Sequence, residues 1–264
     1  MELIKTPLSN LTNDLLSINV VNMPKITHAF TRDSFPVPAG AIAYTGVVND
    51  LIGAAHINSA EWALSDVGFS PPINAPTPVV YATQEPLIAG PQNTAKMVLL
   101  LGQFQPSAVP LLQIGNGNSI IAIDGSATPA NSHVTKTGVS AAASAQTIVN
   151  SLQHAYAVVF GPGSNANYAA DFYFCVHTGA FVTSSGAANI DWITAFDFNT
   201  HLAIGSFGSG SIKIRAILTF EFVAKPKASY IKALMRWLAV NSTNGLPLDS
   251  AGKRALPQLA KGWN

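Results

Sequence analysis

The chain has 264 residues, of which only 10% are charged, with 14 Lys and Arg, 13 Asp and Glu and one Cys; this composition excludes an intrinsically disordered chain and a disulfide-stabilised scaffold. Although 48% of the residues are hydrophobic, the longest apolar runs are far shorter than the ~20 residues of a membrane-spanning helix. The charge is polarised, since residues 1–212 hold five basic and eleven acidic residues whereas residues 213–264 hold nine basic and two acidic ones.

The first half of the chain predicts three strands, two helical segments and a long loop. A weak helical pattern over 8–18 precedes a strand over 41–48, and apolar spacing predicts a helix around 49–63. Six prolines between Pro71 and Pro91 predict an extended loop, because each ring removes a donor and fixes φ. Strands follow over 96–104 and 119–124, and we expect these two to pair in antiparallel fashion.

The second half is also rich in strands. A helix is predicted over 141–152, and strands are predicted over 154–160, 172–177, 192–198 and 211–223. The last strand has the clearest pattern, because Ile214, Ala216, Leu218, Phe220 and Phe222 alternate with residues that include Lys213, Arg215, Thr219 and Glu221. This period of two predicts one core face and one mostly polar face.

An amphipathic helix is predicted over 229–240. Ile231, Leu234, Met235 and Leu238 lie on one stripe, and Lys232 and Arg236 lie four residues apart on another face. The basic charge of this region is typical of contact with nucleic acid or anionic lipid, and equally of a solvated helix face.

Many strands joined by Gly- and Pro-rich loops favour an all-β fold. We predict an antiparallel eight-stranded jelly-roll β-sandwich with peripheral helices and a C-terminal amphipathic helix. The expected organisation is an N-terminal extension over 1–33, a jelly-roll shell domain over 34–226 and a basic helical C-terminal segment over 227–264.

Common catalytic signatures are absent from the sequence, including nucleophile elbows, phosphate-binding loops and zinc-protease motifs. Cys175 lies in a strand-like run and is expected to be a small buried apolar side chain. We therefore predict that the chain is not an enzyme and assign no catalytic residue. The metal content stays unknown, because no spacing distinguishes Asp66, Asp124, Asp191 and Asp197 from turn-forming aspartates. No basic segment leads into an apolar core near Met1, so we expect no secretory signal.

Four stretches carry a resemblance to a known family: 34–44, with the sequence SFPVPAGAIAY; 96–107 followed by 114–124; 208–226, which ends in FEFVAKP; and 230–259, which contains RALP. In their order and pattern they resemble the single jelly-roll coat protein of small non-enveloped positive-strand RNA viruses, of the noda-like, tetra-like and tombus-like group. The family usually begins with a long basic arm, whereas the first 31 residues here contain only Lys5 and Lys25. Either that arm is missing or the basic C-terminal segment replaces it.

The resemblance implies a structural capsid protein that self-assembles into an icosahedral shell and packages viral genomic RNA. The virion would then be its location, after assembly in the host cytoplasm, and its host receptor is unknown. No cofactor is implied apart from inter-subunit Ca²⁺, which the sequence leaves open. The residues expected to face the nucleic acid are Lys225, Lys227, Lys232, Arg236, Lys253, Arg254 and Lys261.

Two other uses of the C-terminal helix stay open. A membrane-active face is suggested by Ile231, Leu234, Trp237 and Leu238, which with two cations suit a bilayer interface. The helix could equally pack under the barrel. For the whole chain, the alternative function is a carbohydrate- or ligand-binding β-sandwich lectin, and a third is a hydrolase with convergent His and Asp residues.

Overall fold

The structure is a computed structural model. It describes residues 25–66, 68–71, 80–82, 94–103, 110–116, 119–124, 130–136, 139–146, 153–162, 168–176, 178–182, 187–190, 202–205 and 213–241. These residues form two antiparallel sheets and one α-helix, with a short 3-10 helix, η2, over Arg32–Ser34. The all-β, sandwich-like fold class predicted from the sequence is confirmed.

The larger sheet has ten strands, with the order β13-β12-β11-β6-β16-β4-β3-β2; β1 also pairs with β16, and β14 pairs with β12. Its strands are β1 (Lys25–Thr31), β2 (Ala43–Asn49), β3 (His56–Ser65), β4 (Gly68–Ser70), β6 (Ala95–Gln103), β11 (Gln153–Pro162), β12 (Tyr168–Val176), β13 (Phe181–Val182), β14 (Ala187–Ile190) and β16 (Lys213–Phe222). Strand β16 thus lies in the middle of the sheet, between β6 on one side and β1 and β4 on the other.

The smaller sheet has six strands in the order β10-β9-β8-β7-β15-β5. They are β5 (Val80–Ala82), β7 (Pro110–Asn116), β8 (Ser119–Asp124), β9 (Ala130–Lys136), β10 (Val139–Gln146) and β15 (Leu202–Gly205). The short β5 lies within the expected proline-rich loop and pairs with β15, so that Ala82 and Ala203, which are 121 positions apart, are partners in the sheet.

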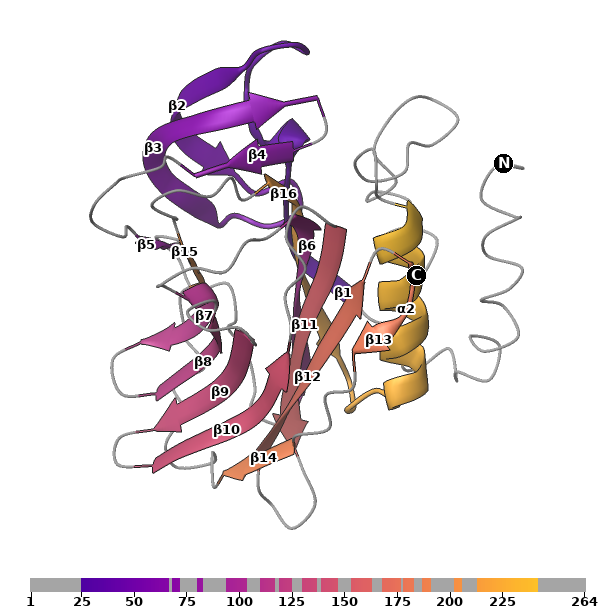
Figure 1. The fold of residues 1–264 in the computed structure, drawn as a ribbon. Coiled ribbons are helices and arrows are strands. Elements are labelled where there is room, and N and C mark those ends of the chain that lie inside the picture. Colours follow the sequence, from indigo (N-terminus) through magenta and orange to yellow (C-terminus); the bar gives the residue numbers. More distant parts are fainter. Residues whose placement is uncertain are drawn as a thin grey trace.

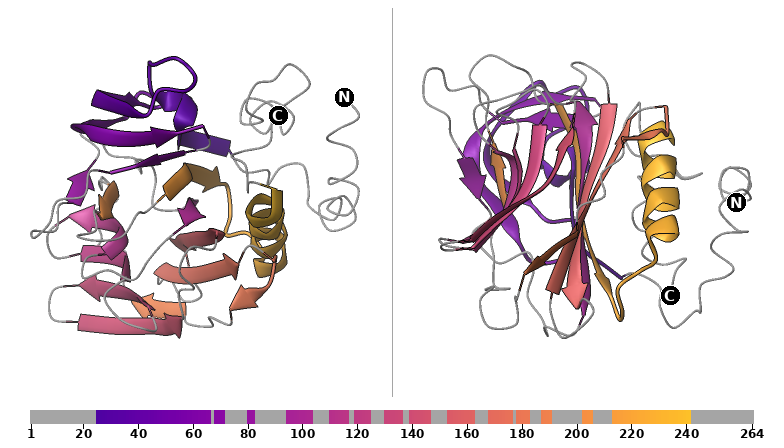
Figure 2. Two further views of the ribbon diagram at one scale, coloured as in Figure 1. Left: turned by 45° about the horizontal axis from the view of Figure 1, so that its top comes forward. Right: turned by 60° about the horizontal axis from the view of Figure 1, so that its bottom comes forward.

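The molecule has three layers (Figure 1). Helix α2 (Ala228–Asn241) lies against one face of the larger sheet, and the smaller sheet lies on the opposite side, as the right-hand view of Figure 2 shows. The central strands of the larger sheet are therefore covered on both faces, and in β6 all residues from Ala95 to Gly102 are buried. A strand that is covered on both faces reads as a continuous apolar run and not as an alternation.

The core beneath α2 is built from alternate residues of the central strands. Met97, Leu99 and Leu101 of β6 face the helix together with Ala216, Leu218, Phe220 and Phe222 of β16. The intervening residues of both strands are directed to the other side of the larger sheet. The predicted alternation in β16 is therefore confirmed, but its polar face is also covered, because Arg215 and Thr219 are buried.

Several predicted strands are confirmed with small shifts of their ends, notably β2, β6, β8, β11, β12 and β16. The expected pairing of 96–104 with 119–124 is wrong. Strand β6 pairs with β11 and β16 in the larger sheet, whereas β8 pairs with β7 and β9 in the smaller one. The described residues also form sixteen strands, twice the number predicted. The predicted strand over 192–198 and the helix over 8–18 lie outside the described residues.

Two predicted helices are wrong, because sheet pairing overrides local propensity. The alanine- and serine-rich residues 139–146 form β10 beside β9, where a helix was predicted over 141–152. Around 49–63 the chain forms a loop and then β3. The register shifts because Gly46 pairs with Ala60 whereas Val48 pairs with Ile57, so β3 carries the extra residue of a bulge. This shift breaks the period of two by which β3 could have been identified.

Both expected extensions contribute to the folded unit. Strand β1 lies within the expected N-terminal extension of residues 1–33 and pairs with residues 216–221 of β16. Helix α2 lies within the expected C-terminal segment and packs on β11 and β12. The predicted amphipathic helix itself is confirmed. Within the part of the chain that the structure describes, no helix has the length and apolar character needed to cross a membrane.

Candidate functional site

The cations of α2 were the leading candidates for contact with nucleic acid. Lys232 and Arg236 are exposed, and each lies over the ring of Phe181 in β13, with its charged group 5.7 Å from the ring centroid. The Nε of Arg236 also donates to the backbone carbonyl of Gly179 at 3.0 Å. Through these contacts the two cations hold the segment from Gly179 to Phe181 against the helix, and the exposed side of each cation faces solvent.

The two lysines before the helix differ from each other. Lys225 forms an ion pair with Asp171 of β12, with 2.8 Å between its Nζ and Oδ2 of the carboxylate. Lys227 is exposed and its backbone carbonyl accepts from the first turn of the helix. Of the predicted cations, Lys225 and Lys227 thus precede α2, whereas Lys232 and Arg236 lie on the side of the helix next to Phe181. The other three, Lys253, Arg254 and Lys261, lie outside the described residues.

The apolar face of α2 is covered by the larger sheet. Ile231, Leu234 and Leu238 are buried in the core beneath the helix, and the partly buried Trp237 packs against it. Of the two uses left open for this helix, packing under the barrel is what the structure shows. A membrane-active face would require α2 to leave the sheet, so that use stays a prediction about another state of the chain.

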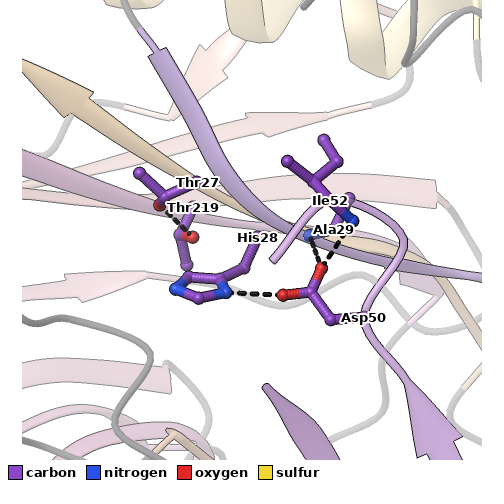
Figure 3. Close-up of polar contacts among 6 residues, drawn as sticks. All are labelled: Thr27, His28, Ala29, Asp50, Ile52 and Thr219. Atoms are coloured by element: carbon purple, nitrogen blue, oxygen red, sulfur yellow. Dashed lines mark hydrogen bonds and ion pairs between the residues drawn. The ribbon is translucent and has the colours of Figure 1, made fainter. Parts of the chain in front are cut away.

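A polar cluster that the sequence did not predict lies where β1 meets the segment after β2 (Figure 3). The Nδ1 of His28 is 2.6 Å from Oδ2 of Asp50. The other oxygen of this carboxylate, Oδ1, accepts from the backbone amides of Ala29 at 2.9 Å and Ile52 at 3.0 Å. Asp50 therefore fastens the start of the loop to β1, and its side chain has no solvent exposure.

The same cluster requires glycine at position 53. A β-carbon on Gly53 would lie 2.6 Å from both His28 Nδ1 and Asp50 Oδ2, closer than real side chains approach. Burial acts to raise the pKa of Asp50, but the hydrogen bonds from His28 and from the amides of Ala29, Ile52 and Gly53 outweigh it, and the pKa lies below its ordinary value. The carboxylate is therefore ionised at neutral pH, and it orients the imidazole by accepting from Nδ1.

The covered polar face of β16 carries three groups with different environments. At one end Glu221 pairs with the buried Lys96, with 2.7 Å between Oε1 and Nζ. In the middle the hydroxyl of Thr219 lies 2.8 Å from that of Thr27. At the other end Arg215 is only 7% exposed, and its Nε and Nη1 are buried without a hydrogen-bond partner.

Arg215 occupies an irregular point of the sheet. The pairing of β16 with β6 shifts between Ile214 and Ala216, so Arg215 is the extra residue of a β-bulge. A bulge changes the direction in which a side chain leaves the sheet, and bulges are common beside functional sites. Burial lowers the pKa of this guanidinium, yet arginine keeps its proton at neutral pH, so a positive charge is buried here without an ion-pair partner among the described residues.

Cys175 is fully buried in β12, as the sequence predicts. Burial raises the pKa of its thiol to about 11, and the nearby Arg236 offsets only part of that effect. Since the thiolate is the reactive form, we expect no modification of the native chain by a thiol reagent at pH 7.5 and complete modification after denaturation. Rapid labelling of the native chain, measured by mass spectrometry, would contradict this expectation.

No group of three or more His, Cys, Asp or Glu side chains that could hold a metal ion occurs among the described residues. Of the aspartates considered for calcium, Asp66 lies in the turn after β3 and Asp124 ends β8, whereas Asp191 and Asp197 lie outside the described part. The structure therefore does not bring Asp66 and Asp124 into a described metal site, and the metal content stays open.

Comparison with known proteins gives a structural likeness only. No family model matches the sequence, and no curated protein matches it. Domain 4 of AbnA, an extracellular GH43 arabinanase from Geobacillus stearothermophilus solved with arabinotriose, is similar with a TM-score of 0.51 and 13% identity; the likeness covers 81% of this chain and 99% of that domain. Trypanosoma rangeli sialidase, solved with 2,3-difluorosialic acid, is similar with a TM-score of 0.50 and 11% identity over 93% of this chain. The match spans 40% of the sialidase chain. At these identities the likeness establishes the β-sandwich fold.

Proposed function

We propose that the chain is a carbohydrate-binding β-sandwich module that binds its ligand without transforming it and acts alone or as a small oligomer. The observation that carries the proposal is the likeness to the arabinanase domain, which covers 99% of that domain and 81% of this chain. The likeness thus extends over a whole domain and not over one hairpin, and that domain was solved with a bound trisaccharide.

The composition supports the same proposal. Only 10% of the residues are charged, although the chain is long enough to expose a large surface. Its surface must therefore be built largely from neutral polar groups, which exchange hydrogen bonds with sugar hydroxyls without the cost of desolvating charges. A neutral surface also suits repeated self-association, because interface cores are depleted in charged residues, and binding of a sugar is an equally good physical use of it.

The test is a binding measurement on the purified full chain. We expect saturable binding to immobilised oligosaccharides, displaced by the same free saccharide and confirmed by calorimetry with arabinotriose and with acidic oligosaccharides as titrants. Light scattering should give a monomer or small oligomer. Absence of binding to every saccharide of a broad array, with correctly folded protein by circular dichroism, would overturn the proposal.

The second candidate is the coat protein that the sequence resembles, with RNA as its partner. The observation that favours it is the exposed cations at one end and one side of α2, Lys227, Lys232 and Arg236. Such cations neutralise phosphates without reading sequence, and their binding weakens as salt rises. A multi-megadalton particle with the ultraviolet absorbance of nucleic acid would favour this candidate over a carbohydrate-binding module, and a small species that lacks nucleic acid would reject it.

A further inference from the structure

Two buried arginines follow the last residue pair of the β1–β16 ladder, and they differ in their hydrogen bonds. The last pair of the β1–β16 ladder joins Thr31 to Ala216, so Arg32 and Arg215 are the next residues on each strand. Arg32 is 6% exposed and Arg215 is 7% exposed. Both positive charges therefore lie where β1 leaves β16, with little water to screen them.

Arg32 has a complete structural explanation. Its Nε donates to the carbonyl of Ser65 at 3.1 Å, and its Nη2 donates to the carbonyl of Pro38 at 3.1 Å and to that of Ala41 at 3.5 Å. The guanidinium thus ties η2 and the following segment to the end of β3. Backbone carbonyls accept from its Nε and Nη2, and these hydrogen bonds account for its burial without a ligand.

Arg215 has no such explanation. Its Nε and Nη1 are buried and unpartnered, and among the described residues no carboxylate forms an ion pair with it. A buried cation whose Nε and Nη1 lack hydrogen-bond partners destabilises the fold, whereas an apolar residue at the same place would not. Folded proteins keep buried polar groups without partners mainly at functional sites, where a ligand can supply the missing partner.

We infer that Arg215 is a ligand-binding residue whose unpaired guanidinium takes the carboxylate of an acidic saccharide. This inference rests on the proposed function and names the class of sugar. A guanidinium offers pairs of parallel N–H donors that match the two oxygens of a carboxylate, and the low local dielectric strengthens the ion pair. A neutral sugar would leave the charge uncompensated, so the acidic group provides the selectivity.

The binding test compares saccharides that differ in the carboxylate. Trigalacturonate and sialyllactose supply it, the methyl ester of trigalacturonate masks it on the same carbon skeleton, and arabinotriose lacks it. We expect the two acids to bind the full chain and the ester to bind at least about 30-fold more weakly, because it leaves a buried charge unpaired. Arg215→Met should weaken the binding of the acids by a similar factor.

Two variants control this measurement. Lys213→Met removes the same charge from an exposed position two residues away on β16, and it should leave the binding of the acids unchanged. Arg32→Met removes a partnered buried arginine and should lower the melting temperature, because its hydrogen bonds to three backbone carbonyls are lost. Arg215→Met should leave the melting temperature unchanged or raise it, which a merely structural arginine would not do.

The outcomes separate the two proposals. Binding of arabinotriose and of the ester as tightly as the acid, with no effect of Arg215→Met, would overturn the role of Arg215 and leave a carbohydrate-binding module. A melting temperature lowered by Arg215→Met as much as by Arg32→Met, with unchanged binding of the acids, would also overturn it and assign a structural role. Failure of every saccharide to bind would reject the proposed function itself.

Discussion

Replacement of Trp62 by alanine is expected to lower the free energy of unfolding by about 3 to 5 kcal/mol. Trp62 of β3 is fully buried. Its ring makes edge contacts with Phe35 at 6.0 Å and with Phe69 at 5.8 Å between centroids. Removal of the indole leaves a cavity that these rings can fill only in part, so the loss exceeds the transfer free energy of the side chain alone.

The measurement is urea unfolding followed by far-ultraviolet circular dichroism. Trp62→Phe should cost less than Trp62→Ala, because a ring remains between Phe35 and Phe69. Ile42→Ala should change stability by less than about 0.5 kcal/mol, since this side chain is 80% exposed. Equal midpoints for Trp62→Ala and Ile42→Ala would show that the aromatic cluster is not part of the cooperative core.

Replacement of Asp50 by alanine is expected to cost about 3 kcal/mol or more, because it removes one partner of a buried, hydrogen-bonded pair. The change leaves His28 without its acceptor and orphans the amides of Ala29 and Ile52. The loop after β2 would then be released from β1, and amide hydrogen exchange at Ala29 and Ile52 should accelerate.

The matched control is Glu61→Ala, which removes an exposed acid from β3 in the same hairpin. We expect a change within about 0.5 kcal/mol for this variant. If both variants unfold at the same urea concentration, the cluster around Asp50 does not stabilise the fold.

The low pKa of Asp50 also predicts a dependence on pH. A carboxyl whose folded pKa lies below its unfolded value of about 3.9 contributes its full stability above that value, and the contribution is lost as the pH falls through the folded pKa. Below about pH 4, the wild-type chain should therefore lose stability more steeply than Asp50→Asn. Parallel pH profiles for the two proteins would contradict the ionised, hydrogen-bonded carboxylate.

The sequence predicts the strands of the larger sheet better than the connections between them. The alternation in β16 and the apolar run in β6 reflect burial, which leaves a direct trace in residue type. The identity of the neighbouring strand does not show in the residue types of a strand, so the predicted pairing of 96–104 with 119–124 was wrong. The strand in 139–146 was missed because its side chains are small, and only the adjacent β9 determines its conformation.

The candidate site was predicted only in part. The cations of α2 form a visible run in the sequence, and the structure does place Lys232 and Arg236 on an exposed face. Arg215 was assigned to the mostly polar face of its strand, and the burial of that face was not predicted, because alternation shows which residues share a face and not what covers it. His28 and Asp50 are 22 positions apart, and no spacing rule joins a strand residue to a loop carboxylate over that distance.

The central place of β16 has a consequence for the synthesis of the chain. The strand ends at residue 222, yet it separates β6 from β1 and β4, which are translated much earlier. Until the ribosome has released this strand, those earlier segments have unpaired backbone edges that invite association with other nascent chains. Folding must therefore wait for most of the polypeptide, and premature termination before residue 213 should yield insoluble fragments in place of a smaller native domain.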